Sequence, residues 1–347
     1  MRSFDYHRLG DCLWDGEVVS LLSQIHEYKG RQDLFVSQRP SSVARLMEIA
    51  KVQSVESSNR IEGIVTTQAR IRSLVADKVM PRNRDEEEIM GYRDVLNMIH
   101  ENHEYITLHS NIVLQLHRDL YAYSHKSIGG QYKNVQNSII ERLADGREVE
   151  RFKPLAPYET PAAIDEICQG VNAVLQDKSV DPLLVIPVFI HDFLCIHPFN
   201  DGNGRMSRLL ATLLLYQNGY MIGKFISLEQ KIERTKDSYY AALGESGVNW
   251  HRGEEDMLPF VKYMLHVILA AYRDFESRIE LLTTSLCAKD RIKIIISATI
   301  GKVTKAGILE KQPDIAVSTV EKALKELVEE GFIERRGAGR STFYVAK

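Results

Sequence analysis

Apolar residues recur at helical spacing along most of the chain, whereas alternating, strand-like patterns are scarce before residue 285. In residues 41–64, for example, Val43, Leu46 and Ile49 lie about one helical turn apart, which indicates an amphipathic helix. Residues 85–106 begin with four acidic side chains, which suit the positive end of a helix dipole. The pattern predicts a mainly α-helical fold. Further helical patterns cover residues 111–123, 161–178, 239–243 and 257–282.

Two apolar segments are predicted to form the centre of this fold. Residues 181–199 are so apolar that a helix there would be buried on all sides. A second apolar helix is predicted to begin near Arg205 and to end at Asn218-Gly219, a favourable pair for a helix C-terminus. The uninterrupted apolar runs in both segments are shorter than the ~18 residues that a membrane span needs. We therefore expect no transmembrane helix.

The helical pattern is interrupted in two regions. Within residues 129–158, the segments QNSII and REVERF flank Asp145-Gly146, which predicts a short β-hairpin, or flap. Residues 285–347 read as a helix, a turn, a second helix that ends at Gly331, and two alternating segments. A helix–turn–helix followed by a β-hairpin is typical of a winged helix. The predicted fold is therefore a helical core with a small hairpin flap and a C-terminal winged-helix domain.

Composition narrows the function classes. A chain of 347 residues is long enough for two or three domains. The 44 Lys and Arg against 47 Asp and Glu give a formal net charge of −3, which excludes a basic coat over the whole chain. The four cysteines show no metal-binding spacing, and the N-terminus has no apolar stretch typical of a secretory signal. We expect a cytoplasmic protein with reduced thiols.

The segment from His197 to Arg208, HPFNDGNGRMSR, combines groups that suit phosphate chemistry. Two glycines around Asn203 allow a tight turn with its amides directed into one concavity, just before a helix N-terminus. Such a site favours phosphate anions. Arg205 and Arg208 share a helix face and can hold a polyphosphate, whereas Asp201 is a hard ligand suited to Mg²⁺. His197 can accept a proton from an attacking hydroxyl.

This segment fits the signature HxFx[DE]GNGRxxR of the Fic (filamentation induced by cAMP) family at every specified position, and the chain resembles that family from about residue 40 to 280. The resemblance implies an all-helical Fic core over 109–284, preceded by an N-terminal helical region over 1–108 and followed by the winged helix over 285–347. It implies a nucleotidyltransferase that uses Mg²⁺ and transfers AMP from ATP to a Ser, Thr or Tyr hydroxyl of a protein target, including the chain itself. The target segment would add to the flap as a β-strand.

The resemblance also assigns roles to residues. His197 would be the general base, Phe199 a buried anchor and Asp201 the Mg²⁺ ligand. Tyr239 and Tyr240 resemble an aromatic pair near the adenine, although ordinary helix packing would also explain them. The residues assigned to nucleotide binding by the motif are Gly202, Asn203, Gly204, Arg205, Met206, Ser207 and Arg208.

Upstream, residues 58–63, SNRIEG, fit the pattern [ST]xxxE[GN] of the family's inhibitory helix, here predicted over about 41–63. Ser58 and Glu62 are four residues apart and share a helix face, and Gly63 suits the helix end. A carboxylate delivered to the phosphate site would pair with Arg208 and exclude the γ-phosphate. The sequence therefore predicts an adenylyltransferase that is autoinhibited by Glu62.

Other functions stay open at this point. The same residues would serve a hydrolase that removes AMP from a modified protein, and the base pocket has no readable code that excludes UMP or GMP. The C-terminal unit, with twelve basic against eight acidic residues over 286–347, offers Arg335, Arg336 and Arg340 to DNA phosphates. Four glutamates in its second helix oppose DNA binding, so dimerisation or target docking is the preferred role. A zinc-protease interpretation lacks an HExxH motif.

Overall fold

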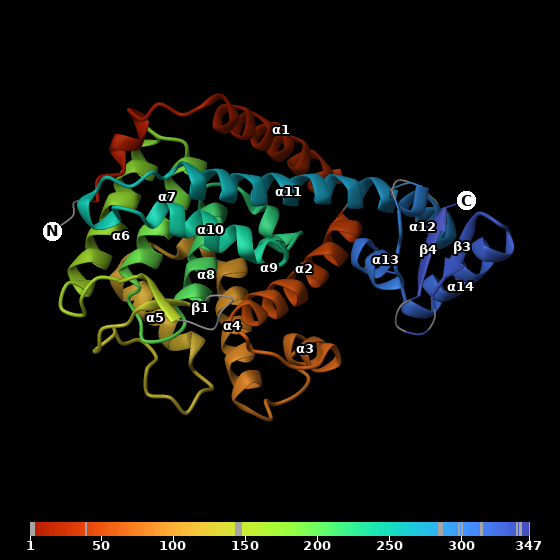
Figure 1. Ribbon diagram of the computed structural model, residues 1–347, viewed down its shortest axis with the longest axis horizontal. Coiled ribbons are helices and arrows are strands. Elements are labelled where there is room, and N and C mark those ends of the chain that lie inside the picture. Colours follow the sequence, from red (N-terminus) through yellow and green to blue (C-terminus); the bar gives the residue numbers. More distant parts are fainter. Residues whose placement is uncertain are drawn as a thin grey trace.

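The structure is a computed structural model that describes residues 4–38, 40–142, 148–283, 287–297, 299, 301–312, 315–337, 339 and 342–346. The described chain is mainly α-helical, as predicted, with two small antiparallel sheets (Figure 1). Its α-helices are α1 (Gly16–Gln38), α2 (Pro40–Ile61), α3 (Gln68–Val75), α4 (Arg84–Asn102), α5 (Ser110–Leu120), α6 (Thr160–Asp177), α7 (Pro182–Ile196), α8 (Asn203–Gln217), α9 (Leu228–Arg234), α10 (Lys236–Gly247), α11 (Leu258–Thr283), α12 (Ala288–Ser297), α13 (Lys305–Lys311) and α14 (Val317–Glu329). The 3₁₀ helices are η1 (His7–Gly10), η2 (His103–Tyr105), η3 (Met221–Lys224) and η4 (Trp250–Arg252), and the strands are β1 (Ile139–Arg142), β2 (Glu148–Phe152), β3 (Ile333–Arg336) and β4 (Phe343–Ala346).

Local capping explains where several helices begin and end. The Asn83 side chain accepts a hydrogen bond from the Glu86 amide (3.0 Å) and so starts α4, whose first turn carries three of the four predicted acidic residues, Asp85, Glu86 and Glu87. At the C-terminal end of α8, Asn218 is the C-cap and Gly219 takes a positive φ of 78°. α1, α3, α9 and α12 lie outside the helices predicted from the sequence. In α1, Val18, Leu21 and Ile25 are buried at helical spacing, and the helix packs against α11.

The two central helices differ from the prediction at the ends that face each other. α7 stops at Ile196 instead of reaching residue 199, and α8 begins at Asn203, two residues before Arg205. The reason is the intervening loop, in which His197 and Gly202 both adopt left-handed backbone. A helix cannot continue through such residues.

α7 lies in the interior, as its apolar sequence predicts, with every residue from Leu183 to Ile196 buried. Buried apolar residues from Phe4 to Ile279 form one cluster, so α1 to α4 share a core with the helices that follow them. A second cluster, from Ile292 to Ile333, belongs to the C-terminal unit beyond α11 (Figure 1). The boundary at 108/109 stays a prediction. No helix within the described ranges is long and apolar enough to cross a membrane.

The predicted hairpin is present. β1 pairs antiparallel with β2, with Ile140 opposite Glu150 and Glu141 opposite Val149. Arg151 on β2 donates a hydrogen bond to the Tyr240 carbonyl and so ties the hairpin to α10. The predicted turn at Asp145-Gly146 lies outside the described residues.

The C-terminal unit has the predicted order of helices followed by a hairpin, in which β3 pairs with β4. Glu326 of α14 and the C-cap residue Glu330 face α12, because Lys289 makes ion pairs with both. On β3, Arg335 and Arg336 are exposed, and Arg336 pairs with Glu334; Arg340 lies outside the described residues. The winged-helix assignment and a role in DNA binding, dimerisation or docking stay predictions.

Gly91 marks the closest approach of α4 to α5, because a Cβ added there would overlap the Leu120 carbonyl. We expect Gly91→Ala to lower the free energy of unfolding by about 1–3 kcal/mol, since backbone atoms cannot move aside as a side chain can. Gly30 in α1 is a matched control, because a Cβ there meets no atom within 4 Å. Gly30→Ala should raise the free energy of unfolding by about 0.5–1 kcal/mol. Urea unfolding followed by circular dichroism measures both, and equal changes would contradict this packing.

Candidate functional site

The loop between α7 and α8 is held in shape by its own side chains. His197 has a φ of 52° and Gly202 a φ of 86°. Glycine adopts this conformation freely, whereas histidine needs support from its surroundings. The buried Asn203 supplies part of it, because its Oδ1 accepts from the Phe199 amide (2.9 Å) and its Nδ2 donates to the Phe199 carbonyl (2.8 Å). Asn203 therefore contributes to the site in two ways: its side chain fixes the shape of the loop, and its backbone amide lies at the start of α8.

Phe199 anchors this loop in the core. Its side chain is fully buried and stacks on the His117 ring with 3.6 Å between centroids and an interplanar angle of 5°. The His117 Nε2 lies 3.0 Å from the Asp201 carbonyl, and its Nδ1 accepts from the Gly130 amide (3.0 Å). One buried histidine of α5 therefore fixes the loop together with the segment that precedes the flap.

His197 is placed as a neutral base. Its Nδ1 lies 3.2 Å from the Leu194 carbonyl, which can only accept, so Nδ1 carries the proton and Nε2 keeps a free lone pair. Burial lowers the pKa of His197 to about 4, and the nearby Lys133 ammonium acts in the same direction. The ring is therefore uncharged at neutral pH and able to accept a proton.

The start of α8 forms an anion site from backbone groups. The first intrahelical bond runs from the Met206 amide to the Gly202 carbonyl (2.9 Å), so the amides before it have no partner within the helix. Met206 is fully buried, and the Ser207 hydroxyl donates to the Gly204 carbonyl (2.8 Å). The Gly202 amide donates to Asp201 Oδ1 (2.8 Å), so the amides of Asn203, Gly204 and Arg205 and the helix dipole remain to attract an anion.

Arg208 is bound to α2. Its Nε donates to the Ser58 hydroxyl (2.8 Å), and its Nη2 donates to the Ser58 carbonyl (2.9 Å) and to Glu62 Oε1 (2.8 Å). The helix ends there because Gly63 turns the chain with a φ of 80°. A Cβ on Gly204 would overlap Glu62 Oε1, so the carboxylate already lies against the anion site. The predicted contact between Glu62 and Arg208 is therefore present.

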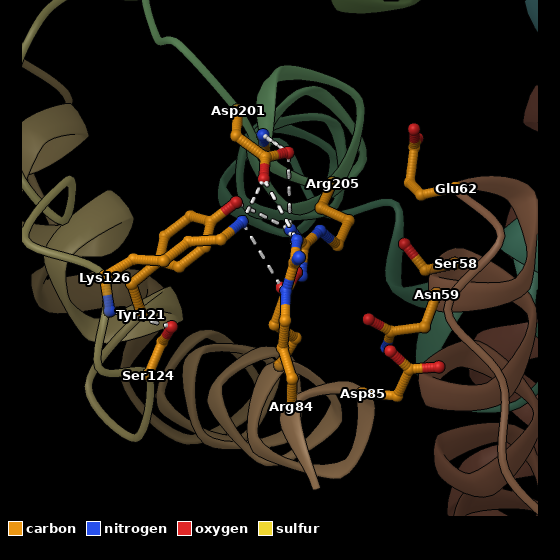
Figure 2. A network of polar contacts seen from close by, with 12 residues as sticks. Ser58, Asn59, Glu62, Arg84, Asp85, Tyr121, Ser124, Lys126, Asp201 and Arg205 are labelled. Atoms are coloured by element: carbon orange, nitrogen blue, oxygen red, sulfur yellow. Dashed lines mark hydrogen bonds and ion pairs between the residues drawn. The ribbon is translucent and has the colours of Figure 1, made fainter.

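Arg205 points into a different polar cluster, shown in Figure 2. Its guanidinium is 1% exposed, forms an ion pair with Glu88 of α4 (2.7 Å) and donates to the Tyr121 hydroxyl (2.7 Å). Its Nε and Nη1 are buried and have no hydrogen-bond partner within the described residues. The structure thus separates two arginines that the sequence assigned to one polyphosphate: Arg208 faces α2, and Arg205 faces α4 and α5.

Asp201 lies at the edge of the same cluster and is surrounded by cations. Its Oδ2 accepts from Lys126 Nζ (2.7 Å), Arg205 lies 3.9 Å from Oδ1, and Arg84 lies 4.0 Å from Oδ2 (Figure 2). Burial would raise the pKa of Asp201, but Lys126 and Arg205 outweigh it, and the pKa lies below its usual value. The carboxylate is ionised and 42% exposed, so it is available to a cation from solvent.

Tyr239 and Tyr240 lie on α10. Tyr239 is buried and packs against Phe260 and Tyr263, with centroids 5.9 and 5.6 Å away. Tyr240 is partly buried, and the field of Glu62 reaches it and raises its pKa in addition to the effect of burial. Tyr239 therefore has the packing role that the sequence left open, and Tyr240 is the member of the pair that stays accessible beside Glu62.

Four polar residues of this site were not found by sequence reasoning. Glu88 and Tyr121 hold Arg205, Lys126 holds Asp201, and Lys133 donates to the carbonyl that precedes His197. None lies in a recognisable pattern. The sole signal was Glu88 itself, an acidic residue on the otherwise apolar face of a predicted helix.

The residues present fit a nucleotide-bound Mg²⁺. No group of three or more His, Cys, Asp or Glu able to hold a metal occurs among the described residues, which gives no support to a zinc centre there. Mg²⁺ differs from zinc in that one or two carboxylates together with substrate phosphates suffice. Asp201 is such a carboxylate, next to the anion site at the start of α8.

Comparison with known proteins agrees with this geometry. Residues 106–215, which contain α5, the hairpin, α6, α7 and most of α8, match the Fic/DOC family. Over this segment the chain is similar to the Fic/DOC family. The matched segment includes His197, Asp201 and both arginines, whereas Glu62 lies outside it.

Distant relatives of this chain are named protein adenylyltransferases. The chain is 24% identical over 255 residues to protein adenylyltransferase fic-1 of Caenorhabditis elegans, an alignment that covers 70% of this chain and 44% of that protein. It is 24% identical over 234 residues to protein adenylyltransferase Fic of Nematostella vectensis, covering 63% and 47%. The chain thus spans slightly less than half the length of these relatives.

Solved structures support the fold. A Fic family protein from Desulfovibrio desulfuricans G20 superposes with a TM-score of 0.64 at 20% identity, and the match covers 97% of each chain. A fragment of Fic-1 from C. elegans gives a TM-score of 0.58 at 20% identity, covering 77% of this chain and 74% of that one. The likeness to the first protein extends over the C-terminal unit as well as the helical body.

The protonation of His197 is directly testable. We expect its ring to titrate near pH 4 in the folded protein, against 6.5 for an unperturbed histidine. As the pH falls, the unfolded chain binds a proton at His197 before the folded chain does. The stability that neutral His197 contributes is therefore complete above pH 6.5 and is lost as the pH falls towards 4. Histidine ¹³C–¹H NMR spectra between pH 3 and 8 measure the titration of the His197 ring, and the His197→Gln variant identifies its signal. A midpoint near 6.5 would show that the ring is solvated and contradict the described burial.

Proposed function

We propose that this protein is a protein adenylyltransferase that uses Mg²⁺ and ATP and is held inactive by Glu62. The observation that carries the proposal is the contact of Glu62 with Arg208 at the anion site of α8, in a loop that also presents a neutral His197. The names of the distant relatives support the same chemistry.

In this proposal His197 and the α8 N-terminus perform the transfer. Nε2 of His197 takes the proton of a Ser, Thr or Tyr hydroxyl as its oxygen bonds to the α-phosphorus of ATP. The bond from that phosphorus to the bridging oxygen of the β-phosphate breaks, and pyrophosphate leaves. The amides of Asn203 and Gly204 and the helix dipole stabilise the negative charge that develops, whereas the Gly202 amide donates to Asp201 Oδ1. Arg208, once free, binds the outer phosphate.

Asp201 would hold the metal. Bound Mg²⁺ supplies charge neutralisation and orientation of the phosphates. In the described state Lys126 occupies the Asp201 carboxylate, so Lys126 and the metal compete for one group. Arg205, which is held by Glu88 and Tyr121, adds a further positive charge next to that carboxylate.

The target would bind along the hairpin. β1 and β2 form an isolated two-stranded sheet among the described residues, and an extended protein segment can add to its edge. Backbone pairing of this kind orders a hydroxyl-bearing segment without reading most of its side chains. The partner is therefore a protein with an accessible hydroxyl, and the chain itself qualifies.

Glu62 inhibits by charge and by position. Its carboxylate places negative charge against Gly204 and engages Arg208, which is 5% exposed and therefore poorly hydrated. A contact of this kind is worth about 1–3 kcal/mol, or roughly 5- to 150-fold in the population of competent enzyme.

Glu62→Gly should therefore raise transfer to a protein target and to the chain itself, within the roughly 5- to 150-fold range given by that contact. The measurement is incorporation of label from α-labelled ATP with Mg²⁺ and a lysate. Arg208→Ala should not mimic this gain, because it removes the phosphate ligand together with the partner of Glu62. His197→Ala in the Glu62→Gly background should lose about 10²-fold or more of the transfer.

For a hydrolase that releases AMP from a modified protein, Glu62→Gly would lower the activity instead of raising it. Glu62 would then orient the attacking water, and Glu62→Gly would lose AMP release in an assay with Mg²⁺ but without ATP. If Glu62→Gly changed neither transfer nor AMP release, the inhibitory role of Glu62 would be wrong.

A further inference from the structure

The backbone of His197 is in a conformation that histidine rarely adopts. Its φ is 52° and its ψ is 63°, and the preceding helix ends at Ile196. Such a residue keeps its conformation because neighbouring groups hold it. Asn203 holds the downstream part of the loop at Phe199, but makes no hydrogen bond to the residues on either side of His197. Another group must therefore act there.

Lys133 is that group. Its amide donates to the Pro198 carbonyl (2.8 Å), and its Nζ donates to the Ile196 carbonyl (2.9 Å). One residue thus binds the carbonyls on both sides of His197. The contact joins chain positions more than sixty residues apart, so it fixes the loop against the segment that precedes the flap.

The side chain of Lys133 is buried without a carboxylate partner. It is 3% exposed and makes no ion pair with any described residue. Its other acceptor is the Asn137 Oδ1 (3.1 Å), and Asn137 in turn donates to the Phe199 carbonyl (3.2 Å). Burial lowers the pKa of Lys133 to about 8, which shows how little its surroundings compensate the charge. An apolar side chain would fill this space more favourably, but it could not bind the Ile196 carbonyl.

We infer that Lys133 is a positioning residue that holds His197 in the orientation needed to accept the hydroxyl proton. This inference rests on the proposed transfer activity for its kinetic consequence alone. Lys133 touches no reacting atom in this account. It acts through the two carbonyls beside His197, and Asn137 supports it from the start of the flap.

The kinetic test compares Lys133→Met with Lys133→Arg in the Glu62→Gly background, with self-incorporation of α-labelled AMP as the readout. A displaced base lowers the rate at saturating ATP, and we expect a loss of about 10- to 100-fold in Lys133→Met, with the half-saturating ATP concentration changed by less than about 3-fold. The backbone amide at position 133 keeps its contact with the Pro198 carbonyl in both variants. An arginine side chain can also donate to the Ile196 carbonyl, so Lys133→Arg should recover most of the rate. Lys78→Met, which removes an exposed lysine after α3, is the matched control and should leave the rate unchanged.

A second readout needs no activity. The charged groups that face His197 are Lys133 and Glu62. In the native chain with Lys133→Met, loss of the cation and of its contact with the Ile196 carbonyl should move the His197 titration upwards from about 4, whereas Lys133→Arg and Lys78→Met should leave it in place. Histidine ¹³C–¹H spectra give this result directly. Amide exchange at residues 196–199 should also become faster in Lys133→Met.

The outcomes separate the two proposals. If no variant incorporates AMP but the His197 titration moves in Lys133→Met, the proposed function fails and the positioning role stands. An unchanged titration together with an unchanged rate would overturn the positioning role. If Lys133→Met does not fold, Asn137→Ala tests the same network: we expect a loss of rate of about 3- to 10-fold, and full activity of that variant would count against the inference.

Discussion

Arg208 is the residue on which the arrangement of this site depends. An arginine that is 5% exposed needs acceptors inside the protein, and Ser58 of α2 together with Glu62, directly after α2, provides all three of those observed. This contact joins positions 146 residues apart and sets where α2 ends relative to α8. It also places a carboxylate at the helix N-terminus where a phosphate would bind. Structural support and the proposed inhibition thus come from one set of hydrogen bonds.

The same principle extends along the site. Each charged group suited to a nucleotide already has a partner of opposite charge: Arg208 has Glu62, Arg205 has Glu88, and Asp201 has Lys126. The described state is therefore neutralised internally, and a bound nucleotide and metal would have to replace partners rather than fill an empty charge site. Glu62 and Asp201 are the more exposed members and can exchange partners, whereas Arg205 and Glu88 are both buried and form the fixed part.

The sequence predicted the parts of this site that depend on local spacing. The glycine turn before α8, the end of α2 at Gly63 and the contact from Glu62 to Arg208 all follow from short patterns, the last of them through the family resemblance. The buried central helix and the hairpin were also predicted correctly. These features are encoded within a few residues of one another, where helical periodicity and turn chemistry apply.

The residues that contact the motif could not be predicted from the sequence, for a different reason. Glu88, Lys126 and Lys133 belong to other elements, and spacing along one helix does not say which distant side chain packs against it. For the same reason the sequence placed Arg205 and Arg208 on one ligand, although α4 and α2 hold them in different clusters. α1 was missed because its apolar positions are separated by many polar residues. Its packing against α11, which the local sequence does not show, stabilises the helix.

The central claim is that Glu62 competes with the γ-phosphate for Arg208. Isothermal titration of ATP and ADP into the native chain and into Glu62→Gln, with Mg²⁺ present, tests it most directly. Because ADP has no γ-phosphate, the account predicts that Glu62→Gln tightens ATP binding by roughly 5- to 150-fold and ADP binding by less than about 3-fold. Equal changes for both nucleotides, or no change for ATP, would contradict it.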